Sequence, residues 1–162
     1  MKDSLAEYKR KRDFSSTEEP EGKIKISKNF RFVIQKHDAT RLHYDFRIEH
    51  EGVLKSWAVP KGLPFKNEDK HLAMHVEDHP IDYFDFEGII PEGNYGAGEV
   101  IVWDMGNYWV PHASDARDVV RLINEGFKKG EIKLILNGRK VKGLFALVRF
   151  KKAGENAWLM IK

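Results

Sequence analysis

From residue 30 onward, apolar and polar side chains alternate with a period of two, and turn residues interrupt the alternation at short intervals. This pattern predicts many short strands rather than helices. The predicted strands cover residues 31–36, 43–49, 53–59, 71–77, 99–103, 108–110, 131–136, 140–150 and 157–161, with a short apolar piece at 84–87. Such a series favours a mainly β fold, and we predict a compact β-barrel of about eight strands.

One segment predicts a helix instead. Ser114 or Asp115 can cap its start, and Gly130 follows its end. Between them, Val119, Ile123 and Phe127 recur at helical spacing. We therefore expect one or two short helices beside the barrel. We also expect residues 105–107 to form a hairpin turn, and the glycine-rich loop 91–98 to be a tight turn that packs Tyr95 against the barrel.

The composition limits the class of protein. A chain of 162 residues with 41% hydrophobic and 12% aromatic residues can bury a core and suits one domain. The absence of cysteine excludes disulfides, thiolate zinc sites and cysteine nucleophiles. No apolar run approaches the ~20 residues of a membrane helix, and no signal-peptide core is present, so we expect a cytoplasmic protein without a membrane partner.

Residues 1–28 differ from the rest because they hold many cations and few apolar side chains. They form either a solvated arm or a basic segment that folds over a phosphate-bearing ligand. We favour a division into an N-terminal arm, residues 1–28, that folds over the active site, and a barrel, residues 29–162.

The strand predicted at residues 43–49 carries the first candidate site. Alternation places His43, Asp45 and Arg47 on one face, opposite the apolar face, and His37 lies on the preceding strand. Two imidazoles and a carboxylate suit Mn²⁺, Zn²⁺ or Fe²⁺. Arg47 would then lie beside the metal, where its planar guanidinium can bind a phosphate.

A second group follows at residues 71–83. Regular alternation places His71, His75 and Glu77 on one face, and we expect that face to line the groove. His75 has the simpler interpretation of a core or supporting histidine. His79 and Tyr83 follow where Pro80 ends the strand, and loops at strand ends often carry functional groups.

These segments resemble a known family. Residues 32–47 (FVIQKHDATRLHYDFR), 77–83 (EDHPIDY) and 86–98 (FEGIIPEGNYGAG) are similar to the 3′-phosphoesterase domain of bacterial DNA ligase D. Residues 8–20, 57–62, 137–149 and 158–162 match it as well, in the same order. The resemblance implies a compact β-barrel that heals DNA 3′ ends before ligation.

The implied activity has two steps. A phosphodiesterase step removes a 3′-terminal ribonucleoside, and a phosphomonoesterase step converts the resulting 3′-phosphate to a 3′-OH. The resemblance implies Mn²⁺ as the preferred metal, with Zn²⁺ or Co²⁺ as alternatives. It implies DNA primer-template 3′ ends as the partner. No ligase module is attached in this sequence, so we expect any ligase it serves to be a separate protein.

The resemblance also implies roles for individual residues. The metal ligands fall on His37, His43 and Asp45, and the catalytic groups on Arg47, Lys61, His79 and Tyr83. Substrate-binding positions fall on Arg12, Glu19, Glu77 and, at the position where the family commonly has arginine, His71. This difference leads us to expect a weaker phosphatase step.

Two other functions fit the same residues less well. A non-haem iron oxygenase could use His43 and Asp45 with a distant histidine such as His112. A barrel without catalytic activity could bind DNA ends, in which case binding would not need the candidate metal ligands.

Overall fold

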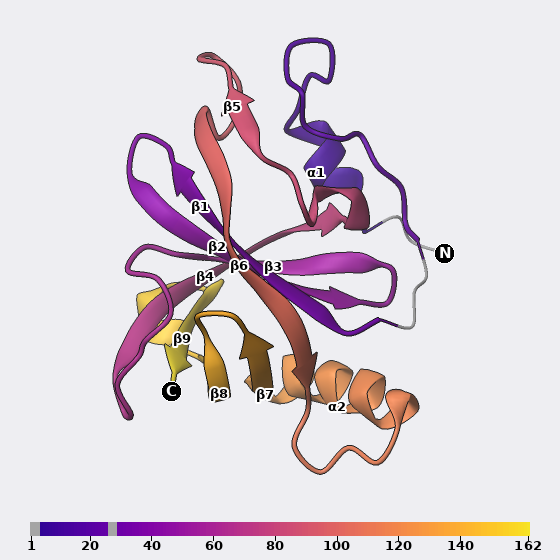
Figure 1. Ribbon diagram of the computed structural model, residues 1–162, viewed down its shortest axis with the longest axis vertical. Helices are drawn as coiled ribbons and strands as arrows, with labels where there is room; N and C mark the ends of the chain where they lie inside the picture. The colour runs from indigo at the N-terminus through magenta and orange to yellow at the C-terminus, as the bar shows by residue number, and fades with distance from the viewer. Residues whose placement is uncertain (1–3, 26–28) are drawn as a thin grey trace.

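The computed structural model describes residues 4–25 and 29–162, and antiparallel strands form its framework (Figure 1). The strands are β1 (Arg31–Asp38), β2 (Leu42–His50), β3 (Val53–Val59), β4 (Lys70–Pro80), β5 (Gly88–Ile90), β6 (Gly98–Trp109), β7 (Glu131–Gly138), β8 (Lys142–Arg149) and β9 (Ala157–Ile161). The α-helices are α1 (Ala6–Arg10) and α2 (Ala116–Lys129), and two short 3₁₀ helices are η1 (Ile81–Tyr83) and η2 (Lys151–Ala153).

The strands form a closed barrel. Their order is β1-β2-β3-β4-β9-β8-β7-β6-β5, and an additional pairing between β1 and β6 joins the two sides. This closure uses eight strands and leaves β5 paired with β6 alone. The mainly β barrel predicted from the alternation is therefore confirmed.

One local prediction is wrong. Residues 105–107 continue β6 rather than turn, because β1 pairs with this part of β6. Gly106 serves close packing here, since a Cβ on it would lie 2.0 Å from the carbonyl oxygen of Asn137 on β7. The apolar piece at residues 84–87 lies between η1 and β5.

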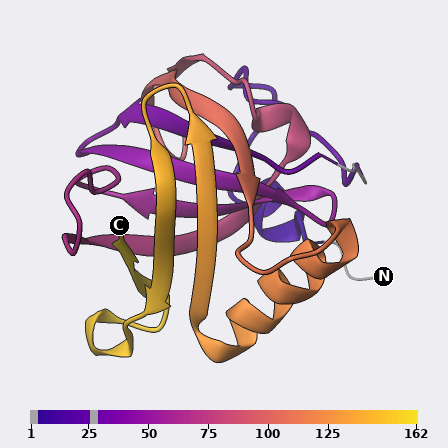
Figure 2. The same ribbon diagram turned by 60° about the horizontal axis from the view of Figure 1, so that its bottom comes forward.

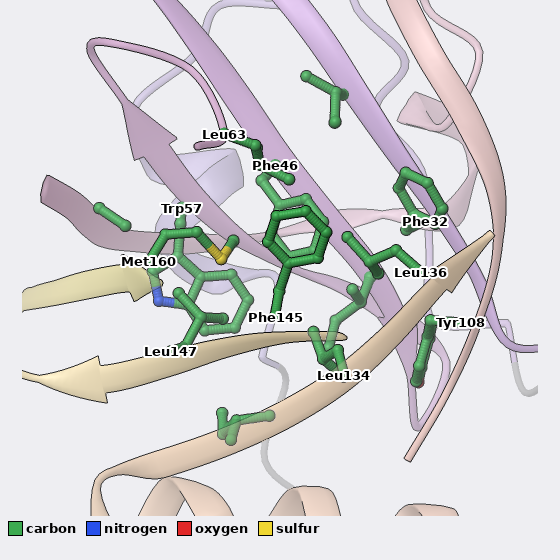
Figure 3. Close-up of a cluster of buried hydrophobic side chains, with 14 of the residues drawn as sticks. Phe32, Phe46, Trp57, Leu63, Tyr108, Leu134, Leu136, Phe145, Leu147 and Met160 are labelled. Atoms are coloured by element: carbon green, nitrogen blue, oxygen red, sulfur yellow. The ribbon is translucent and has the colours of Figure 1, made fainter. Parts of the chain in front are cut away.

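Side chains that point into the barrel form the main core, which Figure 3 shows around Phe46, Trp57, Phe145 and Met160. The predicted helix α2 is present and packs on this core through residues that include Val119 and Ile123. The Asp115 side chain accepts a hydrogen bond from the backbone N–H of Asp118, and Gly130 ends the helix with a positive φ. Figure 2 shows α2 lying along one edge of the barrel.

A second buried cluster lies on the outer surface of the barrel wall, beneath α1, which Figure 1 draws on the opposite side from α2. It consists of Tyr8, Val33, Leu54, Tyr83 and Phe84. Val33 and Leu54 point outward from β1 and β3, and α1 and the segment after β4 pack over them. This part of the wall is buried on both faces, and polar groups on its outer face are shielded from water.

Across residues 4–25 and 29–162, no helix has the length and apolar character needed to cross a membrane.

Candidate active site

The outer face of β1 and β2 brings together three side chains of types that can ligate a metal. His37 pairs directly with His43 across the two strands, and Asp45 lies two residues further along β2. His37 Nδ1 lies 3.4 Å from Asp45 Oδ2, and His43 Nε2 lies 3.2 Å from Asp45 Oδ1. One ligand atom from each residue falls within 4.8 Å of the others, and in the described ranges this is the one group with that property.

The second nitrogen of each imidazole is occupied by a backbone carbonyl. His37 Nε2 lies 2.6 Å from the oxygen of Gly96, and His43 Nδ1 lies 3.1 Å from the oxygen of Arg41. Donation of an N–H to each carbonyl leaves the lone pair of His37 Nδ1 and His43 Nε2 facing the carboxylate. A cation between the three groups would be held by both lone pairs and the carboxylate, as in metal sites whose histidines are oriented this way. Without a cation, a second proton on either ring lets that ring donate to Asp45.

Local charges keep the carboxylate ionised. Burial alone would raise the pKa of Asp45, but the charge of Arg47 and the hydrogen bonds of His37 and His43 outweigh it and hold that pKa far below its usual value. Burial alone would lower the pKa of His43, but the hydrogen bond and charge of Asp45 raise it overall. The trio therefore offers a net negative charge to a cation.

Arg47 occupies the next outward position on β2. Its Nε donates to Gln35 Oε1 at 2.7 Å, its Nη2 lies 3.5 Å from Asp45 Oδ2, and its guanidinium lies 4.9 Å from the centre of the Tyr83 ring. The residue is only 3% exposed, yet among the residues that the structure describes its Nη1 has no hydrogen-bond partner. A buried charged donor without a partner is costly, so Nη1 is free to bind an anion.

The N-terminal arm contributes a second guanidinium. Arg12 Nε donates to Glu19 Oε2 at 2.9 Å, and its Nη1 donates to the carbonyl of Tyr8 and to Glu77 Oε1. Glu19 is buried and also accepts from the Tyr83 hydroxyl at 2.9 Å. These bonds join the arm to β4 and η1.

His79 lies between these groups as a neutral ring. Its Nδ1 lies 2.9 Å from the carbonyl oxygen of Glu77, and its Nε2 lies 3.4 Å from Arg12 Nη2. Because Arg12 can only donate, Nε2 accepts and Nδ1 carries the proton. Burial, with the charges of Arg47 and Arg12, holds the pKa of His79 well below its usual value. Burial also raises the pKa of Tyr83, so its hydroxyl stays protonated.

One cavity of about 250 Å³ unites most of the predicted residues. Its lining includes His37, His43, Asp45, Arg47, Arg12, Glu77, His79 and Tyr83. Glu19 reaches the same network through Arg12 and Tyr83. A larger cavity of about 1180 Å³ lies between α2 and the β2–β3 turn, but the three metal-ligating residues do not line it.

Two predicted residues lie elsewhere. Lys61 is exposed in the turn after β3, and neither it nor His71 lines the cavity. His71 points to the inner side of β4, as Ala73 does, and its Nδ1 lies 2.7 Å from the carbonyl oxygen of Gly62. The prediction that His71 faces the groove is wrong.

A β-bulge in β4 is the reason. Ser56 of β3 pairs with Val76, but Leu54 pairs with His79, so Glu77 and Asp78 together face Lys55. This extra residue shifts the alternation by one position. Val76, Glu77 and His79 therefore all line the cavity, which regular alternation does not allow. His79 belongs to β4 itself and not to a loop after it.

The sequence analysis missed two residues of the site. Gln35 is fully buried, accepts from Arg47, and donates from Nε2 to the carbonyls of Tyr83 and Phe86. Its place two residues before His37, on the same face, was the available signal. Tyr95 lines the cavity and is 47% exposed, so the expectation that it packs against the barrel is wrong.

Comparisons with known proteins point to one family. The model of the DNA Ligase D 3′-phosphoesterase domain family matches residues 35–149. The chain is 51% identical over 162 residues to the multifunctional non-homologous end joining protein LigD of Pseudomonas aeruginosa, covering 98% of this chain and 18% of that protein. It is 47% identical over 159 residues to the protein of the same name from Mycolicibacterium smegmatis, covering 97% and 20%. The chain thus spans about a fifth of the length of these relatives. With the family model matched over most of the barrel, the chain belongs to the DNA ligase D 3′-phosphoesterase domain family.

Proposed function

We propose that this chain is a metal-dependent phosphoesterase that processes the 3′ ends of DNA. It would remove a 3′-terminal ribonucleoside and then the 3′-phosphate that remains, leaving a 3′-OH that a DNA ligase can join. The observation that carries the proposal is the unpartnered Nη1 of buried Arg47, next to three converging metal ligands in one cavity.

The ligand set fits a divalent transition metal. His37 Nδ1, His43 Nε2 and an Asp45 oxygen would hold the ion, and these nitrogen and oxygen donors suit Mn²⁺, with Zn²⁺ or Co²⁺ as alternatives. Such an ion supplies Lewis-acid polarisation of a phosphoryl group. Gly96 and Arg41 orient the two imidazoles through their carbonyl groups.

The other residues of the cavity bind and orient the phosphate. Arg47, fixed by Gln35, presents Nη1 to a non-bridging phosphate oxygen and stabilises the charge that develops there. Arg12 approaches Nε2 of His79, and its charge is balanced by Glu19 and Glu77. His79 is neutral, with its proton on Nδ1, and the lone pair of its Nε2 faces Arg12. His79 therefore starts the reaction as a proton acceptor rather than as an acid.

Both steps are hydrolyses. In the first, a water oxygen bonds to phosphorus and the bond to the 5′ oxygen of the terminal nucleoside breaks, which releases a nucleoside and leaves a 3′-phosphate. In the second, water attacks the same phosphorus and the bond to the 3′ oxygen breaks, which releases inorganic phosphate. The 3′-OH takes up one proton.

The oxygenase alternative expected His112 as the third metal ligand, and His112 lies away from the cavity. His112 is exposed between β6 and α2 and does not line the cavity. A cavity with two guanidinium groups suits a phosphate better than an uncharged substrate.

The test uses a labelled primer-template that ends in one 3′ ribonucleotide, incubated with Mn²⁺ and analysed on a gel. We expect a product shortened by one nucleoside, first with a 3′-phosphate and then with a 3′-OH, and no product with a chelator. Binding of the DNA without cleavage at any tested metal would overturn the proposal and favour the end-binding barrel. Turnover that requires Fe²⁺ and a 2-oxoacid would favour the oxygenase.

A further inference from the structure

Tyr95 is an exposed aromatic residue held on a braced loop. It lies between β5 and β6, and 47% of its surface is accessible although it lines the cavity. Asn94 Nδ2 donates to the carbonyl of Pro91, and the N–H of Ala97 donates to the carbonyl of Asn94. A large side chain on a fixed loop loses little conformational entropy when it binds a ligand.

The loop is tied to both halves of the site. Gly96 follows Tyr95, and its carbonyl oxygen lies 2.6 Å from His37 Nε2. Tyr95 is therefore next in sequence to the residue that orients His37. On the other side, Ser16 Oγ of the arm donates to Asn94 Oδ1 at 2.7 Å. Tyr95 therefore lies where the arm closes over the cavity.

Two cations of the arm approach the ring. Lys11 Nζ lies 4.8 Å and Arg12 Cζ 5.3 Å from its centre, and both residues also bond to Glu77. An aromatic ring beside cations is the usual arrangement for single-stranded nucleic acid, because the ring stacks on a base while the cations neutralise the phosphates.

From this placement we propose that Tyr95 forms a nucleobase subsite, on which the base of the departing 3′-terminal nucleoside stacks. The inference rests on the proposed function. With the phosphate bound at Arg47 and the ligand trio, the departing nucleoside is still attached to that phosphate, and Tyr95 lines the same cavity. The 3′-phosphate left after the first step has no nucleoside there, so it does not use the ring.

The experiment compares two primer-templates of one sequence, ending in a 3′ ribonucleotide or in a 3′-phosphate, with the full chain and Mn²⁺. We expect Tyr95→Ala to lower kcat/KM about 5- to 150-fold for the ribonucleotide end, mainly through KM, as removal of a stacking ring does. The 3′-phosphate end should react at the wild-type rate. Tyr95→Phe, which keeps the ring, should restore the first step.

The control is Phe150→Ala, which removes another partly exposed aromatic ring, 37% accessible, that does not line the cavity. It should change neither step. If Tyr95→Ala lowers kcat/KM equally for both substrates, or for neither, the subsite is overturned. The proposed function stands in that case, because the wild-type chain is active. A wild-type chain inactive on both substrates would overturn the proposed function and the subsite together.

Discussion

His43 is the most accessible member of the ligand trio. Its side chain is 22% exposed, whereas those of His37 and Asp45 are nearly covered. Its removal therefore leaves no cavity in either core cluster. His43→Ala should lower Mn²⁺ affinity and metal-dependent turnover by at least ~10–100-fold, the loss typical even of residues that only orient ligands.

Isothermal titration with Mn²⁺ and the gel assay measure this loss, and thermal melting checks the fold. The matched control is His112→Asn, because His112 is exposed and asparagine tolerates its positive φ. If His43→Ala binds Mn²⁺ as the control does, the metal lies elsewhere.

Gln35 acts through Arg47. It holds the guanidinium by its Nε, and its own amide is fixed by the carbonyls of Tyr83 and Phe86. Gln35→Met, which keeps the shape of the side chain, should lower kcat/KM up to roughly 100-fold because Arg47 loses its position. Combined with Arg47→Ala, it should cost little more than Arg47→Ala alone. Additive losses would show that Gln35 acts independently of Arg47.

Alternation predicted that the three candidate metal ligands share one face, and it predicted the rest of the candidate site less well. His37, His43 and Asp45 lie on two paired regular strands, so residue parity determines their face. Gln35 lies on the same face by the same parity, but an uncharged amide is not a typical metal ligand or catalytic group, so the sequence pattern does not single it out. Tyr95 lies on a loop, where no periodicity indicates which way a side chain points.

At the level of elements, β4 shows where such reasoning fails. One extra residue opposite Lys55 brings Val76 and His79 to one face, while His71 and His75 remain on the other. Bulges depend on pairing with the neighbouring strand, which the sequence of β4 alone does not reveal. His71 was misplaced for this reason, although its assignment came from a reliable alternating pattern.

The N-terminal arm is the second case. It contains few apolar residues, but Leu5 and Tyr8 are fully buried, and the Tyr8 hydroxyl donates to the carbonyl of Pro20. Tyr8→Ala removes a ring whose loss from a core costs roughly 3–5 kcal/mol. Since Tyr8 belongs to the outer cluster and not to the barrel core, we expect the arm to detach while the barrel stays folded.

Limited trypsin digestion measures this detachment, because the arm contains several lysines and arginines. Trypsin should cut the arm of Tyr8→Ala faster than that of wild type. The variant should also lose turnover, because the detached arm removes Arg12 and Glu19 from the site. Glu7→Ala, an exposed change on the same helix, should behave as wild type. If Tyr8→Ala also lowers the melting temperature of the barrel, the arm and the barrel unfold as one unit, and this expectation is wrong.

The whole molecule has two hydrophobic layers on one barrel wall. The inner layer was predictable, because its residues alternate along nearly every strand. The outer layer was not, because Val33 and Leu54 meet partners from α1 and η1 that are distant in sequence. This second layer shields the ion pairs of Arg12, Glu19 and Glu77 from water.

Buried histidines make the stability of the whole chain depend on pH. Burial is the largest cause that lowers the pKa of His50, His75 and His79. The unfolded chain therefore binds protons below about pH 6.5 that the folded chain does not, and the free energy of unfolding falls as the pH drops. His43 acts in the opposite sense: its raised pKa contributes stability that is present below pH 6.5 and lost as the pH rises. Because three histidines lower the stability at acid pH and one raises it, the free energy of unfolding should be smaller at pH 5.5 than at pH 7.5.

His75 allows this balance to be tested away from the metal ligands. Its ring stacks on Trp57 at 5.2 Å and lies 5.4 Å from Phe127, and its buried Nε2 has no hydrogen-bond partner within residues 4–25 and 29–162. Desolvation lowers its pKa most; Asp78 opposes that shift, and Lys55 and Arg149 add to it. His75→Phe keeps an aromatic ring but takes up no proton when unfolded, so its loss of stability between pH 7.5 and 5.5 should be smaller than that of wild type. Urea unfolding followed by circular dichroism at both values measures the difference, with His112→Asn as the exposed control. An identical loss in His75→Phe and wild type would show that His75 is protonated as easily in the folded chain as in the unfolded one.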